Sequence, residues 1–272
     1  LASSTQAEHD NLYGKSKLSA EIAIKNLAND TVNSAYIYRL PGVFGKWCKP
    51  NYNSVVATFC HNISHDLPIQ VNDPSFELSL VYIDDVVEEF VEVIQGYRSG
   101  GKVPSVQPEY KIKLGDLANQ IKIFKESRDS LITEKVGSGL VRKLYSTYLS
   151  YISPEQFSYL IPSYGDERGM FAEMLKTKDS GQFSFFTAKP GVMRGGHYHH
   201  SKTEKFLVVQ GDAKFGFRHI ISNESYEIIT SSKELKIVET VPGWSHDITN
   251  IGVEDMVVML WANEIFDPDN PD

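Results

Sequence analysis

The sequence predicts an α/β segment followed by an all-β barrel, joined in one chain of 272 residues. Two observations support this fold class. In the first half, short β-rich runs alternate with runs whose apolar residues recur at helical spacing, which is typical of sheets crossed by helices. After Pro162 the chain has only short β-rich segments separated by Gly, Pro and Asn. We place the boundary near residues 150–160 and divide the chain into residues 1–152 and 153–272.

The individual elements follow from local patterns. In the first half we predict a strand end at 1–2, a polar loop at 3–6, a helix at 12–27, a strand at 36–40, a strand at 80–83, a helix at 84–94 and helical structure over 111–149. The turn Pro41-Gly42 closes the second of these strands. In the second half we predict strands at 183–186, 206–210, 226–230 and 256–261.

Bulk composition excludes several classes of protein. A net charge of -8 and a sequence pI near 5.5 argue against a nucleic-acid partner, which usually meets a basic face. No apolar run approaches the roughly 18 residues of a membrane span, so we expect no membrane association. Cys48 and Cys60 are the only cysteines and are not in CxxC spacing, which fits a reducing compartment. We therefore expect a cytoplasmic protein.

A tyrosine and a lysine in the first predicted helix form a candidate catalytic pair. Tyr13 and Lys17 are four residues apart, so both side chains project from one helical face. A nearby ammonium group lowers the pKa of a tyrosine, which suits Tyr13 to exchange a proton with a carbonyl or hydroxyl oxygen. Ser4 in the preceding loop could hold the same oxygen. Such a pair also occurs by chance on many helices, so by itself it indicates catalysis only weakly.

The surrounding sequence strengthens this interpretation. The strings LASSTQA, NLYGKSK, RLPGVFG and VYIDDV, in this order, resemble the second half of an extended short-chain dehydrogenase/reductase, which has a Rossmann-like fold. The resemblance implies catalytic roles for Ser4, Tyr13 and Lys17 with a nicotinamide cofactor. It also implies that Tyr13 and Lys17 contact this cofactor and that Leu40 and Val43 lie beside the nicotinamide.

One part of that family's pattern is missing. The glycine-rich phosphate loop, GxxGxxG after a first strand, does not occur before Ser4. Its glycines let backbone amides approach the pyrophosphate. We therefore expect an N-terminal truncation of roughly 100 residues, about one mononucleotide-binding half, and an incomplete reductase site.

Histidines and a glutamate in the second half form a candidate metal site. The residues at motif spacing are Gly191, His197, His199, Glu204 and Gly211, followed by Pro242-Gly243, His246 and Asn250. We expect His197 and His199 to alternate along one strand and so to face the same way, with Glu204 and His246 on neighbouring strands. Three imidazoles and a carboxylate suit a divalent metal such as Zn²⁺. The plain alternative is a chance cluster of histidines, which the full spacing of two motifs disfavours. The motifs resemble those of the cupin family, which implies metal ligation by His197, His199, Glu204 and His246.

The segment KPGVMRGGHY has a further resemblance. It is similar to a segment of nucleotide-linked 4-keto-6-deoxysugar epimerases that carries a catalytic histidine after an Arg-Gly pair. This implies that His197 is the catalytic base and that Arg194 contacts substrate. Those epimerases typically lack the metal set and use a tyrosine on a late strand as proton donor. Residues 256–261 contain no tyrosine, which leaves Tyr198 and Lys205 as candidates for the donor.

The two resemblances conflict at His197, because a metal-bound imidazole cannot also deprotonate the substrate. We favour the ligand assignment, because the full cupin spacing is retained. Either way the chemistry is coherent. A 4-keto group acidifies the hydrogens on the neighbouring carbons, so a base and an electrophile can invert one centre before the ketone is reduced. Zinc could polarise the carbonyl or could only stabilise the barrel.

Taken together, the halves resemble a family of bifunctional capsular-polysaccharide enzymes. That family epimerises a UDP-2-acetamido-2,6-dideoxy-4-hexulose at C-3 in the cupin domain and reduces C-4 with NADPH in the reductase domain. The product is UDP-2-acetamido-2,6-dideoxy-L-talose, on the route to UDP-N-acetyl-L-fucosamine. The resemblance therefore implies a UDP-linked 4-keto-6-deoxy amino sugar as substrate, Zn²⁺ and NADPH as cofactors, and a homodimer.

Three alternatives remain open at this point. The cupin domain could be an iron-dependent oxygenase, or a metal-locked dimerisation or sugar-binding module without chemistry. The whole protein could also be a nucleotide-sugar epimerase whose reductase half only recycles its cofactor.

Overall fold

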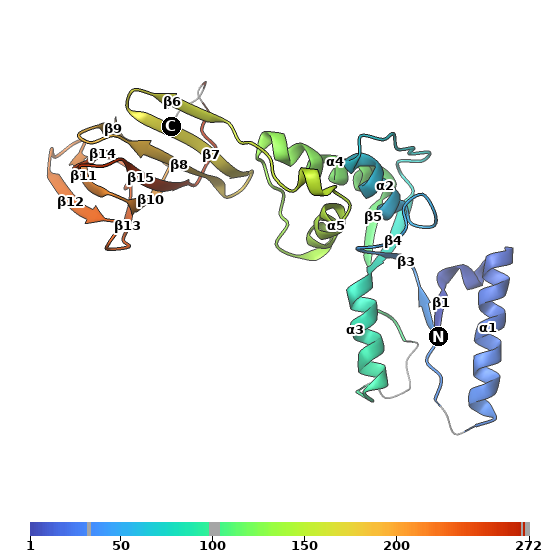
Figure 1. Ribbon diagram of the computed structural model, residues 1–272. Coiled ribbons are helices and arrows are strands. Elements are labelled where there is room, and N and C mark those ends of the chain that lie inside the picture. The colour runs from blue at the N-terminus through green and yellow to red at the C-terminus, as the bar shows by residue number, and fades with distance from the viewer. Residues whose placement is uncertain (32–33, 98–103, 268, 270–272) are drawn as a thin grey trace. The chain divides into compact units, whose positions relative to one another are not determined.

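The chain forms two compact units, each with its own core (Figure 1). The computed structural model describes residues 1–31, 34–97, 104–267 and 269. The first unit comprises residues 1–125 and 136–157, and the second comprises residues 126–135 and 158–272. The fold class is confirmed, because an α/β unit is followed by a β-rich one. The predicted boundary between residues 152 and 153 stays a prediction.

The first unit mixes short strands with helices. Its elements are β1 (Ala2–Ser4), the 3-10 helix η1 (Thr5–Glu8), α1 (Leu12–Asn29), β2 (Tyr38–Leu40), β3 (Gly42–Phe44), α2 (Val55–Ser64), β4 (Glu77–Tyr82), α3 (Ile83–Ile94), β5 (Tyr110–Lys113), α4 (Leu114–Ser130), which continues into the second unit, α5 (Gly139–Leu149) and the 3-10 helix η2 (Pro154–Gln156). β1 pairs with β2 in parallel, and β4 lies between β3 and β5 in a second sheet. Apolar side chains from α2, α4 and α5 pack into one core with β3 and β4.

Local sequence explains most of these elements. The predicted helices at 12–27 and 84–94 and strands at 36–40 and 80–83 are present within a few residues of the expected bounds. The prediction of helical structure from residue 111 was wrong at its start, where β5 pairs antiparallel with β4. Four residues in strict alternation are too few to distinguish a strand from a helix, and the partner strand decides between them.

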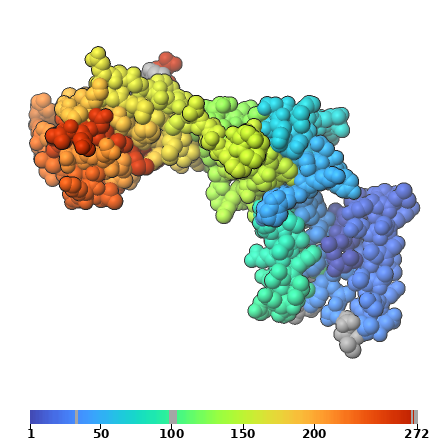
Figure 2. All heavy atoms as spheres, viewed as in Figure 1, coloured from blue at the N-terminus to red at the C-terminus, as the bar shows by residue number. Residues whose placement is uncertain are grey.

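The second unit consists of two packed sheets. Its strands are β6 (Ser163–Asp166), β7 (Gly169–Thr177), β8 (Gly181–Ala188), β9 (Met193–His197), β10 (Glu204–Gln210), β11 (Asp212–His219), β12 (Ser225–Ser231), β13 (Ile237–Glu239), β14 (Trp244–Asn250) and β15 (Met256–Ala262). One sheet has the order β13-β10-β15-β8-β7-β6 and the other β12-β11-β14-β9. The described strands thus form two open sheets and not one closed ring. In the space-filling view the yellow-to-red residues form a continuous body (Figure 2).

The core of this unit lies between the two sheets. Phe186 and Phe206 contribute from the six-stranded sheet, and Phe215 and Ile248 contribute from the four-stranded sheet. Alternation of buried and exposed residues along β8, β10, β11 and β14 directs one face of each strand inward. The polar residues of the candidate metal site interrupt this apolar face. Within the described ranges, no helix is both long and apolar enough to cross a membrane.

Candidate functional site

The predicted reductase residues line a single pocket in the first unit. Ser4, Tyr13, Lys17, Leu40 and Val43 all face a cavity of about 740 Å³. The other residues that line it, which sequence reasoning did not single out, are Ala2, Ser3, Thr5, Gln6, Pro41, Gly42, Cys48, Asn53 and Ser54. The structure therefore brings together residues from β1, α1, β2 and β3 that lie up to about 40 positions apart in the sequence.

The start of α1 is fixed by two local contacts. Asn11 caps the helix, and its side-chain oxygen accepts a hydrogen bond of 2.7 Å from the amide of Gly14. A Cβ atom on Gly14 would lie 2.2 Å from the carbonyl oxygen of Gln6. Only glycine permits this approach of η1 to α1. The helix that carries Tyr13 therefore packs directly against η1, which follows Ser4 at the end of β1, where we predicted a loop.

The three polar residues are arranged around the pocket as follows. Tyr13 is 53% exposed, so its phenol is accessible. The ammonium of Lys17 lies 5.6 Å from the centroid of the Tyr13 ring and 3.5 Å from the carbonyl oxygen of Ala2. The hydroxyl of Ser4 accepts a hydrogen bond of 3.2 Å from the amide of Gln6, and this bond caps the start of η1. This arrangement leaves Tyr13 able to meet a substrate oxygen.

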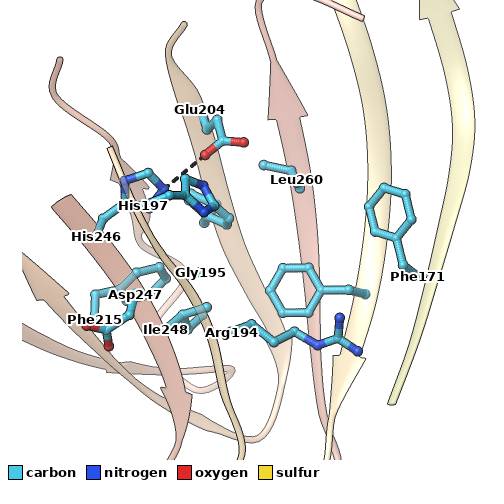
Figure 3. Close-up of a pocket in the computed structure, with 12 residues that line it drawn as sticks. Phe171, Arg194, Gly195, His197, Glu204, Phe215, His246, Asp247, Ile248 and Leu260 are labelled. Carbon is cyan, nitrogen blue, oxygen red and sulfur yellow. Dashed lines mark hydrogen bonds and ion pairs between the residues drawn. The ribbon is translucent and has the colours of Figure 1, made fainter. Parts of the chain in front are cut away.

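A second pocket, in the β-rich unit, contains most of the candidate metal ligands. It has a volume of about 160 Å³ and is lined by Phe171, Phe186, Arg194, Gly195, His197, Glu204, Phe206, Phe215, His246, Asp247, Ile248 and Leu260. Figure 3 shows His197, His246 and Glu204 together at one end, while Arg194 extends toward the side of Phe171. The candidate ligands thus gather at one end of the pocket, away from Phe171.

All four predicted ligands come together here. One ligand atom from each of His197, His199, Glu204 and His246 can be chosen so that all lie within 4.8 Å of one another. An oxygen of Glu204 lies 3.2 Å from Nε2 of His246 and 3.4 Å from Nε2 of His199. His199, Glu204 and His246 are buried, whereas His197 is exposed. His197 therefore occupies the solvent side of the cluster.

The two sheets supply the ligands. His197 at the end of β9 is the cross-strand partner of His246 on β14, and Glu204 begins β10 in the other sheet. We expected His199 on the same strand as His197, but β9 ends at His197 and His199 lies in the following loop. Gly195 has φ +90, and a Cβ atom there would lie 2.9 Å from the carbonyl oxygen of His246. Glycine therefore allows the irregular pairing of β9 with β14 beside the cluster.

Burial and neighbouring charges shift the pKa values of this cluster. Burial alone would raise the pKa of Glu204, but the hydrogen bond from His246 and the charge of Lys202 lower it below its ordinary value. Partial burial, with the neighbouring His246 and His199, lowers the pKa of His197. Both shifts favour the forms of Glu204 and His197 that bind a divalent metal, which are the ionised carboxylate and the neutral imidazole.

Arg194 has the features of a ligand-binding cation. Its guanidinium lies 5.4 Å from the centroid of the Phe186 ring. Burial lowers its pKa, and within the described chain its buried Nε atom has no hydrogen-bond partner. A cation with a buried donor that no residue satisfies is costly unless another group accepts the bond. Arg194 lines the pocket, so its positive charge lies beside this cavity.

The residues considered as second proton donors are not in this pocket. Lys205 forms an ion pair of 2.6 Å with Glu239, and Tyr198 stacks edge-on against His200. Neither lines the cavity. Asp247, which sequence reasoning missed, does line it, and burial raises the pKa of this carboxyl group. The cross-strand partner of Asp247 is Gly216, and because Gly216 has no side chain there is room for the Asp247 carboxylate.

Comparison with known proteins identifies relatives of both halves. Residues 2–107 match the NAD dependent epimerase/dehydratase family, and residues 164–272 match the polysaccharide biosynthesis C-terminal domain. A UDP-2-acetamido-2,6-beta-L-arabino-hexul-4-ose reductase of Pseudomonas aeruginosa is 61% identical over 270 residues. This match covers 99% of the chain and 73% of the relative.

Solved structures agree with this relationship. The capsular polysaccharide assembling protein CapF from Staphylococcus aureus matches with a TM-score of 0.95 and 45% identity, over 100% of this chain and 74% of that one. CapF in complex with the inhibitor 3-isopropenyl-tropolone matches with a TM-score of 0.88 and 44% identity, over 93% of this chain and 73% of that one.

Proposed function

We propose that the chain epimerises and then reduces a UDP-linked 4-keto-6-deoxy amino sugar. The chain belongs to the CapF-like family of bifunctional capsular-polysaccharide enzymes, and this membership supports the proposal. The substrate is a UDP-2-acetamido-2,6-dideoxy-4-hexulose, and the product is UDP-2-acetamido-2,6-dideoxy-L-talose, on the route to UDP-N-acetyl-L-fucosamine. The supporting observation is that a proton-donating Tyr-Lys pair lines one pocket and a His-Glu cluster lines another. Residues 1–152 carry the reductase domain and residues 153–272 the cupin domain.

The reductase pocket fits a nicotinamide cofactor. Its polar groups adjoin an apolar wall that includes Leu40 and Val43, which suits the flat face of a nicotinamide. Bound NADPH supplies the hydride that reduces C-4. Tyr13 donates its phenolic proton to the keto oxygen and Ser4 holds that oxygen, so the ketone becomes an alcohol. The ammonium of Lys17 stabilises the resulting phenolate.

The cupin pocket fits a divalent metal, because three imidazoles and one carboxylate offer nitrogen and oxygen donors at close range. Bound Zn²⁺ supplies a Lewis acid or holds the two sheets together. His199, Glu204 and His246 are buried and come from both sheets, which suits them to hold the ion. We assign His197 as the fourth ligand, and its alternative role is to remove the proton at C-3.

Epimerisation at C-3 requires a proton to leave one face of the sugar and another to return on the opposite face. The adjacent ketone makes this possible by delocalising the negative charge. Arg194 contacts the substrate through its guanidinium, and the aromatic side chains Phe171 and Phe186 cover the apolar face of the ring. Epimerisation precedes reduction, because an alcohol at C-4 no longer acidifies C-3.

Two assays on the full-length protein test this proposal. Incubation of the UDP-4-keto sugar in deuterated water should introduce deuterium at C-3, and NADPH should be oxidised in stoichiometric amounts. Deuterium exchange without NADPH oxidation would indicate an epimerase that only recycles its cofactor. The absence of exchange would indicate a sugar-binding or dimerisation module in the second unit, and oxygen consumption with ferrous iron would indicate an oxygenase.

Two further assignments stay predictions. A homodimer is checked by the mass of the protein in solution. A cytoplasmic location, favoured by the two free cysteines, is checked by cell fractionation.

A further inference from the structure

A buried carboxylate lies beneath the reductase pocket. The side chain of Glu21 on α1 is only 1% exposed, and it does not line the cavity. Tyr13, Lys17 and Glu21 follow each other at intervals of four residues, so all three project from one face of the helix. The face of α1 that carries the proposed proton donor therefore continues into an anionic group that the proposed chemistry does not use.

Glu21 is held by partners from two other elements, and one of these partners also bonds a third element. It accepts a hydrogen bond of 2.5 Å from the hydroxyl of Ser3 on β1. Arg39 on β2 donates two hydrogen bonds to this carboxylate, from Nε at 2.9 Å and from Nη2 at 2.7 Å. The remaining nitrogen of Arg39, Nη1, reaches Glu8 at the end of η1 at 2.9 Å. We call Glu21, Ser3 and Arg39 the Glu21 clamp.

Each partner in the clamp is next to a residue of the pocket. Ser3 precedes Ser4, and Arg39 precedes Leu40. The 3-10 helix η1 begins after Ser4, which caps it, and ends at Glu8. The clamp therefore joins the backbone that presents Ser4 to the helix that presents Tyr13.

The opposite charges of Glu21 and Arg39 hold the clamp together. An ionised carboxylate is buried only when hydrogen bonds and an opposite charge compensate for its lost hydration. The hydrogen bonds from Arg39, against the opposing effect of burial, lower the pKa of Glu21 to about 2. The group therefore stays ionised at every pH at which the enzyme works, and it acts through fixed geometry and not through titration.

We propose that Glu21 is a positioning residue of the reductase site, which sets the separation and orientation of Ser4 and Tyr13 through Ser3 and Arg39. This inference rests on the proposed reductase function. Two residues that address the same substrate oxygen must be placed accurately, and small misplacements slow such reactions strongly.

The test compares Glu21→Gln with Glu8→Gln in the full-length protein. Glutamine keeps the size of the side chain but removes the charge that orders Arg39. We expect kcat for NADPH oxidation to fall by about 10- to 100-fold in Glu21→Gln, with little change in the KM for the sugar. The pKa values seen in the pH profile of kcat should not change, while the maximum kcat falls. Glu8→Gln removes an exposed carboxylate from the same guanidinium and should leave kcat within about twofold.

Hydrogen exchange over residues 2–8 gives a readout that does not depend on turnover. It should be at least about tenfold faster in Glu21→Gln than in Glu8→Gln, because the clamp no longer holds β1 and η1. If the wild-type protein does not oxidise NADPH with the 4-keto sugar, the proposed function fails, and this exchange measurement still decides whether the clamp exists.

A folded Glu21→Gln protein with kcat within about twofold of wild type would overturn the inference. If that variant does not fold, Ser3→Ala decides, because it removes the contact to β1 without leaving a charge unpaired. The inference then requires at least about a threefold loss of kcat at unchanged cofactor affinity, and wild-type kcat refutes it.

Discussion

Replacing His246 by alanine tests whether the His-Glu cluster binds a metal. His246 is 5% exposed, and its Nε2 lies 3.2 Å from the carboxylate of Glu204. Without metal, the substitution removes one hydrogen bond from a buried carboxylate, which costs about 1–3 kcal/mol. With zinc at about 100 times the dissociation constant, the wild-type protein gains about 2.7 kcal/mol more, and the variant loses this gain.

The assay is thermal unfolding of the second unit, with zinc and with a chelator. At about 3–6 °C per kcal/mol for a unit of this size, zinc should raise the wild-type midpoint by about 8–16 °C and should barely move that of His246→Ala. Metal analysis of the purified proteins should show zinc in the wild type alone. A wild-type protein that holds no zinc, and whose midpoint zinc does not raise, would refute the metal site.

His197→Ala then separates the two roles proposed for that residue. Deuterium exchange at C-3 should stop whether His197 is a ligand or the base. If His197 is a ligand, zinc affinity also falls, because one of four donors is lost. Unchanged zinc stoichiometry and affinity would contradict the ligand assignment and leave His197 as the base.

Three further predictions concern single positions. Tyr13→Phe in the full-length protein should reduce NADPH oxidation by about 10²- to 10⁴-fold while C-3 exchange continues, and loss of both activities would contradict separate sites. Asn250→Ala should destabilise the second unit by about 3 kcal/mol, seen by denaturant unfolding, because its buried side chain donates to Ala188 and Glu254 at 2.8 Å each and accepts from Gly252 at 2.9 Å. The folded pKa of Glu21 is lowered, so its ionised carboxylate stabilises the folded protein fully above the unfolded pKa of 4.5. This contribution is lost as the pH falls toward the folded pKa of about 2. The free energy of unfolding should therefore be lower at pH 2 than at pH 6, with Glu21 contributing at most about 3 kcal/mol of the difference. The Glu21→Gln variant should lack this contribution.

Sequence spacing predicts site residues where chemistry constrains local spacing. Tyr13 and Lys17 must be four residues apart to share a helical face, and a metal set needs imidazoles at short, fixed intervals. These constraints act within a few residues, so they are visible in the sequence. The pocket around Ser4, Tyr13 and Lys17 in the structure agrees with that spacing.

The sequence was less informative where distant segments meet. The strand β5 was predicted as helix, because its residues become a strand only through pairing with β4. His199 was placed on a strand, yet β9 ends before it at an irregular pairing with β14. Both cases depend on a partner strand more than 20 residues away, which no local pattern encodes.

By itself, the sequence determined the α/β and β-rich halves, and it predicted the Tyr-Lys pair and the His-Glu cluster, because each depends on periodicity or on short spacing. Only the tertiary structure decided which side chains share a buried environment. It showed that Glu21 pairs with Arg39 and Ser3, that Asp247 faces the second pocket, and that Lys205 points away from it. Burial and long-range pairing are properties of the folded chain, because they depend on which strands and helices become neighbours in space.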